Sequence, residues 1–583
     1  MRTTFTLDVS FPIEMFSYWN IATLAILSGS VAAVPALDVR AAANAYAPYT
    51  TACPSSALVR IATTISSAES SYVAQRKAKA DVALVSWLEK INPGFGTTDL
   101  PSLGLVLSGG GYRALLNEAG MMQALDSREK STSVSGLLQA FTYQSSLSGG
   151  GWLSNSLASF NWPTISYMMS KIWNSNFANG LLLPDNIGAI LDYPTIVGAV
   201  SAKQAAGYNV SLADLYGRLL GYNLLSGNDG GVAVRLSGLT QMSKFQSFDV
   251  PYPIITSIGT NLDVGQCSVT LNSTQYEFSP FEFGSWDTGI RAFTPTQYMG
   301  SKLVNGKPTG QCTANFDNLG LITASTSNVF PGLCYIFPVS GSPISLNVSG
   351  TTGDIAQAIE NVFIQIAKPL FTELFNLIPN PFKGIASATV VSGQDQLYLG
   401  DGGLSSQNAP IWPFIQPVRN VSALYGTDLK PSLTSIRLLT LRLVADIGGD
   451  GANSYNSGAS LYNVYVQAKA RGLVKMPYIP PVSTFTSRNL TSRAQFFGCD
   501  EPNTVTIIWT PLVSYNYPSN ISGSVLELPV AQTNGIIGNG NLLATQNGDS
   551  EWPTCLACAL MKKTSSSIPS ECTVCFAKYC FKN

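Results

Sequence analysis

The sequence predicts an α/β fold with many loop insertions, and three observations support that prediction. Strand-like apolar runs alternate with helical patterns, as where residues 103–107 lead into residues 113–125. The 583 residues, 45% of them hydrophobic, suffice for a sizeable core. No repeat of fixed period and no Pro- or Ser-rich linker divides the chain. We therefore expect one large unit over residues 37–549, with residues 550–583 as a cysteine-rich extension of the same domain.

Composition excludes several function classes. Only 11% of residues are charged, and 33 basic against 34 acidic side chains give a formal charge of −1 without long runs of either sign. Electrostatic capture of nucleic acid is therefore disfavoured. The chain has no histidine, which removes Ser-His-Asp and Cys-His mechanisms and every His-ligated metal site.

The N-terminal region predicts secretion. Residues 21–36 form a short apolar segment that ends in small residues, as in a signal peptide, and we assign residues 1–36 to that peptide. Asp8 and Glu14 are unusual in such a leader, so Met15 is an alternative start, and a buried or interfacial helix is the alternative reading. Six N-glycosylation sequons support export: Asn209, Asn272, Asn347, Asn420, Asn489 and Asn520.

A triple glycine at residues 109–111 joins the apolar run of residues 103–107 to a helical pattern. Glycines at a strand-to-helix junction can point their amides at a negative charge, because the helix N-terminus favours anions. The loop could hold a phosphate or an oxyanion. No Walker A or GxGxxG pattern is completed, and a purely structural turn remains the alternative.

A second strand, turn and helix pattern covers residues 137–160. The turn reads Ser146-Leu147-Ser148-Gly149-Gly150, which is the setting of a nucleophile elbow that exposes the serine oxygen. Ser146 replaces the first glycine of the usual GxSxG. An ordinary Ser/Gly loop is the alternative.

Residues 355–378 repeat apolar side chains at three- or four-residue steps and predict an amphipathic helix bent at Pro369. Core packing is the favoured role, and a lid or lipid-facing helix is the alternative.

Without histidine, a serine nucleophile needs a carboxylate, a lysine or a terminal amine as its base. Asp401 ends an apolar run and precedes two glycines, so it should lie at a strand end facing a neighbouring loop. Asp229 and Asp450 are the alternative carboxylates, both in turn-like contexts.

Ten cysteines in an exported chain predict disulfides. The two CxxC pairs near the C-terminus also match a zinc ribbon, but the oxidising compartment favours disulfides. Only Phe-Lys-Asn follows the last cysteine, so we expect no C-terminal lipid-anchor signal. Five cysteines lie within the last 29 residues: Cys555, Cys558, Cys572, Cys575 and Cys580.

Together these motifs resemble the fungal lysophospholipase or phospholipase B family, which is related to the catalytic domain of cytosolic phospholipases and remotely to patatins. The resemblance runs from about Cys53 to the C-terminus. It implies a patatin-like, cytosolic-phospholipase-type catalytic domain, in which helices flank a central mixed sheet and disulfides staple the C-terminus. The segments that carry it are SGGGYRA at 108–114, LSGGGWL at 147–153, FEFGSWD at 281–287, DGG at 401–403, QNAPIWP at 407–413, WPTCLACA at 552–559 and CTVCFAKYC at 572–580.

The resemblance also implies residue roles. Ser148 corresponds to the family's nucleophile and Asp401 to its partner. Gly110 and Gly111 correspond to the oxyanion hole, and Arg113 to an arginine that binds the substrate phosphate or neutralises charge. A salt bridge that holds the glycine loop is the alternative role for Arg113. Two positions depart from the family pattern, namely Ser146 in place of glycine and Gly151 in place of serine or threonine.

We therefore predict a secreted or cell-wall-associated hydrolase that releases fatty acid from phospholipids or lysophospholipids through a Ser-Asp dyad and an acyl-enzyme. It needs no cofactor and no metal, contacts a membrane or micelle surface transiently, carries N-linked glycans and binds no nucleic acid. The alternatives are a non-catalytic lipid- or wall-binding glycoprotein of the same fold and a carboxylesterase of other lipids.

Overall fold

The computed structural model describes residues 45–181, 187–260, 269–333, 373–428, 455–523, 525 and 527–582, which belong to one compact unit, Val39–Asn583. The predicted signal peptide, the sequon at Asn347 and the alternative base Asp450 lie outside the described residues. Among the described helices, none is both long and apolar enough to cross a bilayer.

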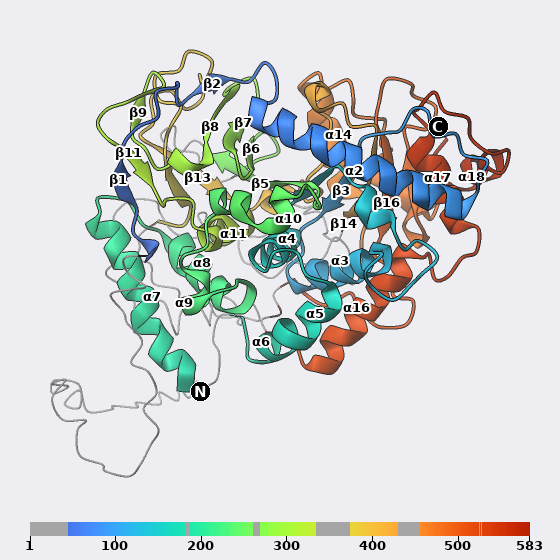
Figure 1. Cartoon of the computed structure of the whole chain (residues 1–583), viewed down its shortest axis with the longest axis horizontal. Coiled ribbons are helices and arrows are strands. Elements are labelled where there is room, and N and C mark those ends of the chain that lie inside the picture. Colours follow the sequence, from blue (N-terminus) through green and yellow to red (C-terminus); the bar gives the residue numbers. More distant parts are fainter. Residues whose placement is uncertain are drawn as a thin grey trace, which may run out of the picture. The chain divides into compact units, whose positions relative to one another are not determined.

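A mixed sheet of 12 strands organises this unit (Figure 1). The central strands of the sheet, from β16 (Thr506–Pro511) to β5 (Tyr252–Thr260), pair in parallel. Antiparallel strands extend the sheet on both sides. Two further antiparallel pairs are β1 (Tyr49–Thr51) with β11 (Cys312–Ala314) and β9 (Leu303–Val304) with β10 (Lys307–Pro308). In spatial order the sheet contains β15 (Gln495–Phe497), β16 (Thr506–Pro511), β14 (Ala423–Asp428), β3 (Leu103–Leu107), β4 (Tyr143–Ser146), β5 (Tyr252–Thr260), β6 (Thr274–Phe278), β7 (Glu282–Ser285), β8 (Ala292–Pro295) and β2 (Arg60–Ile61), while β13 (Gln396–Gly400) joins β5 off this path and pairs with β12 (Asn376–Pro379).

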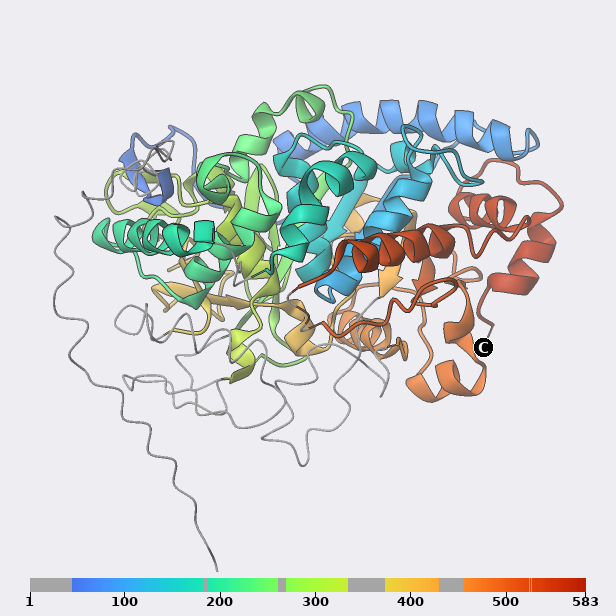
Figure 2. The ribbon, with the colours of Figure 1, turned by 90° about the horizontal axis from the view of Figure 1, so that it is seen from below.

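Helices surround the sheet (Figures 1 and 2). The long α2 begins at an N-cap, Ser66, whose hydroxyl accepts the amide of Glu69, and it runs across the front of Figure 1. Helix α16 packs closely on α3, because Gly120 and Gly540 face each other: a Cβ on Gly120 would lie 2.8 Å from the Cα of Gly540. The α-helices are α2 (Ser67–Ile91), α3 (Tyr112–Leu125), α4 (Ser148–Ser159), α5 (Ile165–Met168), α6 (Asn174–Ala178), α7 (Ile187–Ala205), α8 (Leu212–Leu224), α9 (Asn228–Gly231), α10 (Ser243–Gln246), α11 (Leu319–Ser327), α14 (Ala459–Ala470), α15 (Val482–Ser487), α16 (Val530–Ala544), α17 (Trp552–Met561) and α18 (Cys572–Tyr579).

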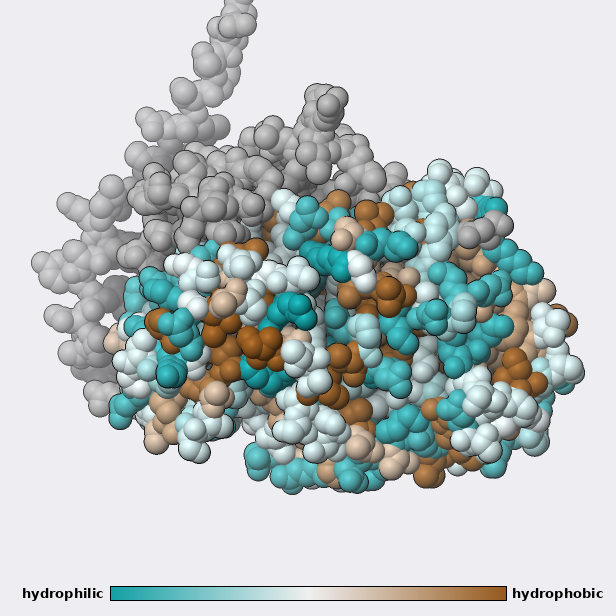
Figure 3. Space-filling model, turned by 90° about the horizontal axis from the view of Figure 1, so that it is seen from above, coloured by the Kyte–Doolittle hydropathy of each residue, from teal (hydrophilic) through white to brown (hydrophobic). Residues whose placement is uncertain are grey.

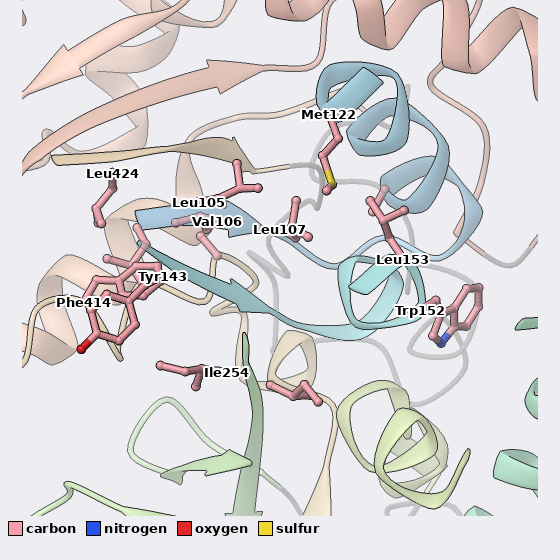
Figure 4. Packing of buried hydrophobic residues seen from close by; sticks show 14 of the residues in the cluster. Leu105, Val106, Leu107, Met122, Tyr143, Trp152, Leu153, Ile254, Phe414 and Leu424 are labelled. Atoms are coloured by element: carbon pink, nitrogen blue, oxygen red, sulfur yellow. The ribbon is translucent and has the colours of Figure 1, made fainter. Parts of the chain in front are cut away.

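One part of the core lies between the parallel strands and helices α3 and α4. Every residue of β3 is buried, as expected of a strand covered on both faces. Figure 4 shows the side chains of Leu107 on β3, Met122 on α3 and Leu153 on α4 meeting in this layer. The predicted strand and helix over residues 103–125 are confirmed.

The C-terminal cysteines form disulfides and no zinc ribbon. Cys555 pairs with Cys575 and Cys558 with Cys572, which joins α17 to α18, and Cys580 pairs with Cys499. A fourth bond links Cys53 to Cys312. The disulfide prediction is therefore confirmed for the eight described cysteines.

The predicted helix over residues 355–378 is wrong at its C-terminal end. Asn376–Pro379 forms strand β12, because its backbone pairs with β13 and so extends the sheet. Residues 355–372 lie outside the described residues.

On the face shown in Figure 3, apolar residues form several small groups that polar residues separate. Such scattered apolar side chains are normal on a folded surface.

Candidate active site

Ser148 lies at a sharp turn between β4 and α4. Its backbone φ is 53°, in the left-handed region that non-glycine residues seldom adopt. The glycines after it allow the turn to press against β3, since a Cβ on Gly150 would lie 2.4 Å from the carbonyl oxygen of Leu107. This geometry is that of a nucleophile elbow, in which a strained turn presents the serine oxygen at the edge of the sheet.

Asp401 meets this serine from a strand that is distant in sequence. It follows β13, whose antiparallel pairing with β5 brings Gly400 opposite Ile258. The Ser148 hydroxyl donates to Asp401 Oδ2 at 2.7 Å, and both residues are buried, at 6% and 1% exposure. The amide of Gly403 donates to the other oxygen, Oδ1, at 2.7 Å. One carboxylate oxygen is thus fixed by backbone while the other faces the serine.

The glycine loop lies directly beside the elbow. Gly110 and Gly111 have φ values of 143° and 59°, which L-residues with a Cβ rarely adopt. A Cβ on Gly149 would lie 2.2 Å from the Gly111 carbonyl oxygen, so the two turns are in backbone contact. Within the described residues, the amides of Gly110 and Gly111 donate to no protein acceptor. They are available as hydrogen-bond donors for an anion.

Side chains from other elements fix both turns. Thr326 on α11 accepts the amide of Ser148 at 3.1 Å and donates to the Thr256 carbonyl at 2.6 Å. Asn408 donates from its side chain to the Gly109 carbonyl at 2.7 Å, and its own carbonyl accepts the Gly109 amide at 3.2 Å. Each turn is therefore held by a side chain of its own, and the Gly150 amide, which donates to the Ser108 carbonyl at 2.9 Å, joins the two turns directly.

Glu118 supports the start of the glycine loop from within α3. Its carboxylate is buried and accepts the Ser108 amide at 2.6 Å and the Ser108 hydroxyl at 3.0 Å. Thr427, at the end of β14, donates its hydroxyl to the same oxygen. This buried carboxylate joins β3, α3 and β14 at the point where the loop begins.

Arg113 lies on the first turn of α3, where its side chain is fully buried. Its guanidinium donates to the carbonyl of Ile521 at 2.7 Å. A Cβ on Gly111 would lie 2.7 Å from the carbonyl oxygen of Gly523. The segment that contains Ile521 and Gly523 therefore lies over the glycine loop, and the hydrogen bond from Arg113 helps to hold this segment in place.

The alternative base Asp229 is not brought to the serine. It lies in α9 with φ of 49°, and its carbonyl accepts a bond from Arg218. Ser146 is buried at the end of β4. At Gly151, a Cβ would lie 2.6 Å from Thr326 Cγ2, which explains why a glycine suits this position.

The charge of Asp401 acts on Tyr216, a buried tyrosine of α8. Burial raises the pKa of the Tyr216 hydroxyl, a hydrogen bond with Ser327 opposes the rise, and the negative charge of Asp401 adds to it. Within the part of the chain that is described, no cluster of three or more cysteine or carboxylate side chains is arranged to hold a metal ion.

The sequence motifs located the serine, the aspartate and the glycine loop, but they missed the side chains that hold them. Glu118, Thr326 and Asn408 carry no motif of their own, because each acts through a contact between segments far apart in the chain. One signal was present for Asn408, which lies seven residues after Asp401 in the QNAPIWP segment.

Comparison with known proteins identifies the family to which this chain is similar. The family model for the lysophospholipase catalytic domain matches residues 103–583. Probable lysophospholipase 5 of Schizosaccharomyces pombe is 34% identical over 94% of this chain and 88% of its own length. Lysophospholipase 1 of Candida albicans is 34% identical over 92% of this chain and 89% of its own.

Among solved structures, human GIVD cytosolic phospholipase A2 superposes with a TM-score of 0.64 at 17% identity, over 88% of this chain and 69% of that one. At this identity the likeness shows a shared fold, which confirms the predicted cytosolic-phospholipase-type architecture. From the family model and the curated relatives, the chain belongs to the family of lysophospholipase catalytic domains.

Proposed function

We propose that this chain is a lysophospholipase of the phospholipase B type, which hydrolyses acyl esters of glycerophospholipids through the dyad of Ser148 and Asp401. The observation that carries the proposal is the 2.7 Å hydrogen bond from the Ser148 hydroxyl to the Asp401 carboxylate, at a strained turn beside two glycine amides without protein acceptors. Family membership supports a lipid ester as the substrate.

The first half-reaction transfers the acyl group to the serine. Ser148 Oγ attacks the ester carbonyl carbon and its proton moves to Asp401 Oδ2. The amides of Gly110 and Gly111 donate hydrogen bonds to the oxyanion of the tetrahedral intermediate. When the intermediate collapses, the bond to the glycerol oxygen breaks and that oxygen takes the proton from Asp401. The products of this step are an acyl-serine and a deacylated alcohol.

The second half-reaction uses water. Asp401 accepts a proton from a water molecule that attacks the acyl carbonyl, and the same amides hold the new oxyanion. Collapse returns the proton to Ser148 Oγ and releases a fatty acid, so both side chains regain their starting states. No histidine is needed, in agreement with the composition of the chain.

The role of Arg113 toward the substrate phosphate remains part of this proposal. Its guanidinium is buried and engaged with the Ile521 carbonyl. Contact with a substrate phosphate therefore requires displacement of the segment around Ile521, and the positive charge beside the glycine loop would then face the headgroup.

Single substitutions test the dyad. Ser148→Ala and Asp401→Asn should each lower fatty-acid release from lysophosphatidylcholine by at least about a thousandfold, because each removes a group that acts in every turnover. Ser146→Ala and Asp229→Asn are matched controls, a buried serine two residues away and an aspartate distant from the serine, and both should keep near-normal rates. Melting temperatures confirm that all four variants fold.

Two further measurements separate the rival functions. A serine-directed fluorophosphonate should label the wild-type chain and leave Ser148→Ala unlabelled; a wild-type chain without labelling would identify a non-catalytic binding protein. A higher rate on triacylglycerol than on lysophosphatidylcholine would identify a carboxylesterase of other lipids. Retained hydrolysis in Ser148→Ala would place the nucleophile elsewhere.

We also propose that the protein is secreted, N-glycosylated and in transient contact with a membrane or micelle surface. Four sequon asparagines, Asn209, Asn272, Asn420 and Asn489, are exposed, and Asn520 is half-buried. The disulfides fit an oxidising compartment. Digestion of the secreted protein with an endoglycosidase should raise its gel mobility, and Asn→Gln at the exposed sequons should remove most of that shift. An intracellular protein without a shift would refute this.

A further inference from the structure

A cavity lies far from Ser148, where helices α3 and α4 end. It has a volume of about 400 Å³, within the usual range for small-molecule sites. Leu157 of α4 lines it, nine residues after Ser148, which at 1.5 Å per residue is about 13 Å along the helix. Met122 of α3 lines it as well. The cavity is therefore separate from the catalytic serine.

The cavity is partly apolar and reaches into the core. Met122, Leu157, Trp162 and Ile165 line it, and each is at most 6% exposed. At the rim, Val82 of α2 is 69% exposed. An apolar chain that entered from the rim would therefore contact side chains that are otherwise hidden from water.

The rest of the lining carries an excess of positive charge. Arg76, Lys79, Arg128 and Lys244 face two carboxylates, Asp126 and Asp249. Lys79 pairs with Asp249 at 2.6 Å and Arg128 with Asp126 at 2.7 Å. Within the described residues, Arg76 and Lys244 form no ion pair with a carboxylate. Two positive charges in this wall thus lack a direct counter-ion.

Two of these cations converge on one oxygen. The Trp162 carbonyl accepts Lys244 Nζ at 2.6 Å and an Arg128 guanidinium nitrogen at 3.0 Å. Arg76 donates to the carbonyls of Phe141, Gln139 and Phe248. Burial lowers the pKa of Lys244, and the nearby charge of Arg128 lowers it further, whereas Asp126 and Asp249 oppose this. Arg128 is already paired with Asp126, and a carbonyl dipole offsets the full charge of Lys244 only in part, so an anion here would be stabilised.

We propose that this cavity binds a single-chain amphiphile with an anionic headgroup, either a carboxylate or a phosphate. The headgroup contacts Lys244 and Arg128, and the chain lies against Met122, Leu157 and Ile165. A fatty acid and an anionic lysophospholipid share this chemistry. The site does not depend on the function proposed for Ser148.

The test is calorimetric titration of the full-length Ser148→Ala chain with laurate, lauroyl lysophosphatidate, dodecanol and inorganic phosphate. Laurate should bind saturably. Adding Lys244→Gln should weaken it at least about tenfold, because a hydrogen bond to a charged group is lost. Lys90→Gln, which removes an exposed lysine of α2 away from the cavity, is the matched control and should leave laurate affinity unchanged.

A second variant tests the site without changing Lys244, in case Lys244→Gln fails to fold. Val82→Glu adds a negative charge at the exposed rim and should weaken laurate binding while the melting temperature stays unchanged. Tighter binding of lauroyl lysophosphatidate than of laurate would assign the phosphate as the natural headgroup, and the reverse would assign the carboxylate. Dodecanol and inorganic phosphate should each bind more weakly than the full amphiphiles, because each lacks one of the two contacts.

Three results would overturn the site: no saturable laurate binding, equal laurate affinity in Lys244→Gln and Lys90→Gln, or dodecanol binding as tightly as laurate. With Ser148 intact, Lys244→Gln should hydrolyse dilute lysophosphatidylcholine at the wild-type rate. Failure of this site and failure of the proposed hydrolase are therefore distinguishable.

Discussion

At the scale of single residues, the carboxylate of Asp401 differs from one that merely caps a turn. In an aspartate that caps a turn, the carboxylate oxygens accept hydrogen bonds from backbone amides, and Asp401 Oδ1 accepts such a bond from the Gly403 amide. Because this bond and the bond from the Asp401 amide to the Asn328 carbonyl set the orientation of the side chain, Oδ2 stays directed at the Ser148 hydroxyl. In the proposed mechanism, Ser148 therefore meets its base without a histidine.

Glu118 gives a residue-scale prediction about positioning. Glu118→Ala leaves the buried Ser108 amide without its acceptor, which should cost about 1–3 kcal/mol of stability and shift the glycine loop. A shift of about 1 Å there should lower kcat by about a hundredfold with little change in KM, because the loop acts on the transition state. Steady-state kinetics and chemical denaturation measure both effects.

Glu118→Gln is the conservative control. All three donors meet one carboxylate oxygen, so an amide oxygen can accept them, and kcat should return to within about tenfold of wild type. If the alanine variant keeps a normal kcat once its folded fraction is taken into account, Glu118 acts on stability alone.

At the scale of elements, the sequence predicted what local pattern determines. The apolar run over residues 103–107 and the glycines before α3 predict a strand, a turn and a helix, and the structure confirms all three. The segment 376–378 was misassigned because its apolar spacing fits a helix, whereas pairing with β13 decides its conformation. The contact between Ser148 and Asp401, which lies 253 residues later, depends on strand order. The local pattern favoured Asp401 as the base, and the resemblance supported its pairing with Ser148.

The pairing of α17 with α18 gives an element-scale prediction. Replacing Cys558 and Cys572 together with serine removes a crosslink between residues 14 apart. In the chain-entropy model this should lower the free energy of unfolding by less than about 3 kcal/mol, because Cys555–Cys575 still closes the surrounding loop. Denaturant unfolding of the oxidised double variant measures this. Fatty-acid release by the folded protein should persist, since neither cysteine contacts the dyad. Unchanged stability would mean that the Cys555–Cys575 bond and the packing of α17 suffice to hold this end.

At the scale of the whole molecule, buried carboxyl groups set the dependence of stability on pH. Burial raises the pKa of Asp287, Asp317 and Glu373, although the Arg471 charge opposes the rise at Asp287 and amide bonds oppose it at the other two. A raised folded pKa means that the native state binds the proton more tightly than the unfolded chain. Such a group contributes its full stability below its unfolded pKa and loses that contribution as the pH rises through its folded pKa.

The melting temperature should therefore be higher at pH 5 than at pH 7.5. Carboxyl groups with lowered pKa, such as Asp249, are ionised in both the folded and the unfolded state across this pH range, so they do not oppose the trend. Asp317→Asn keeps an acceptor for the Ser237 amide without a charge, so the melting temperature of this variant should change less between these pH values. Asp249→Asn, which changes a half-exposed carboxylate in the same way, should leave the slope unchanged. A wild-type melting temperature that rises from pH 5 to pH 7.5 would contradict the control of this slope by the buried carboxyl groups.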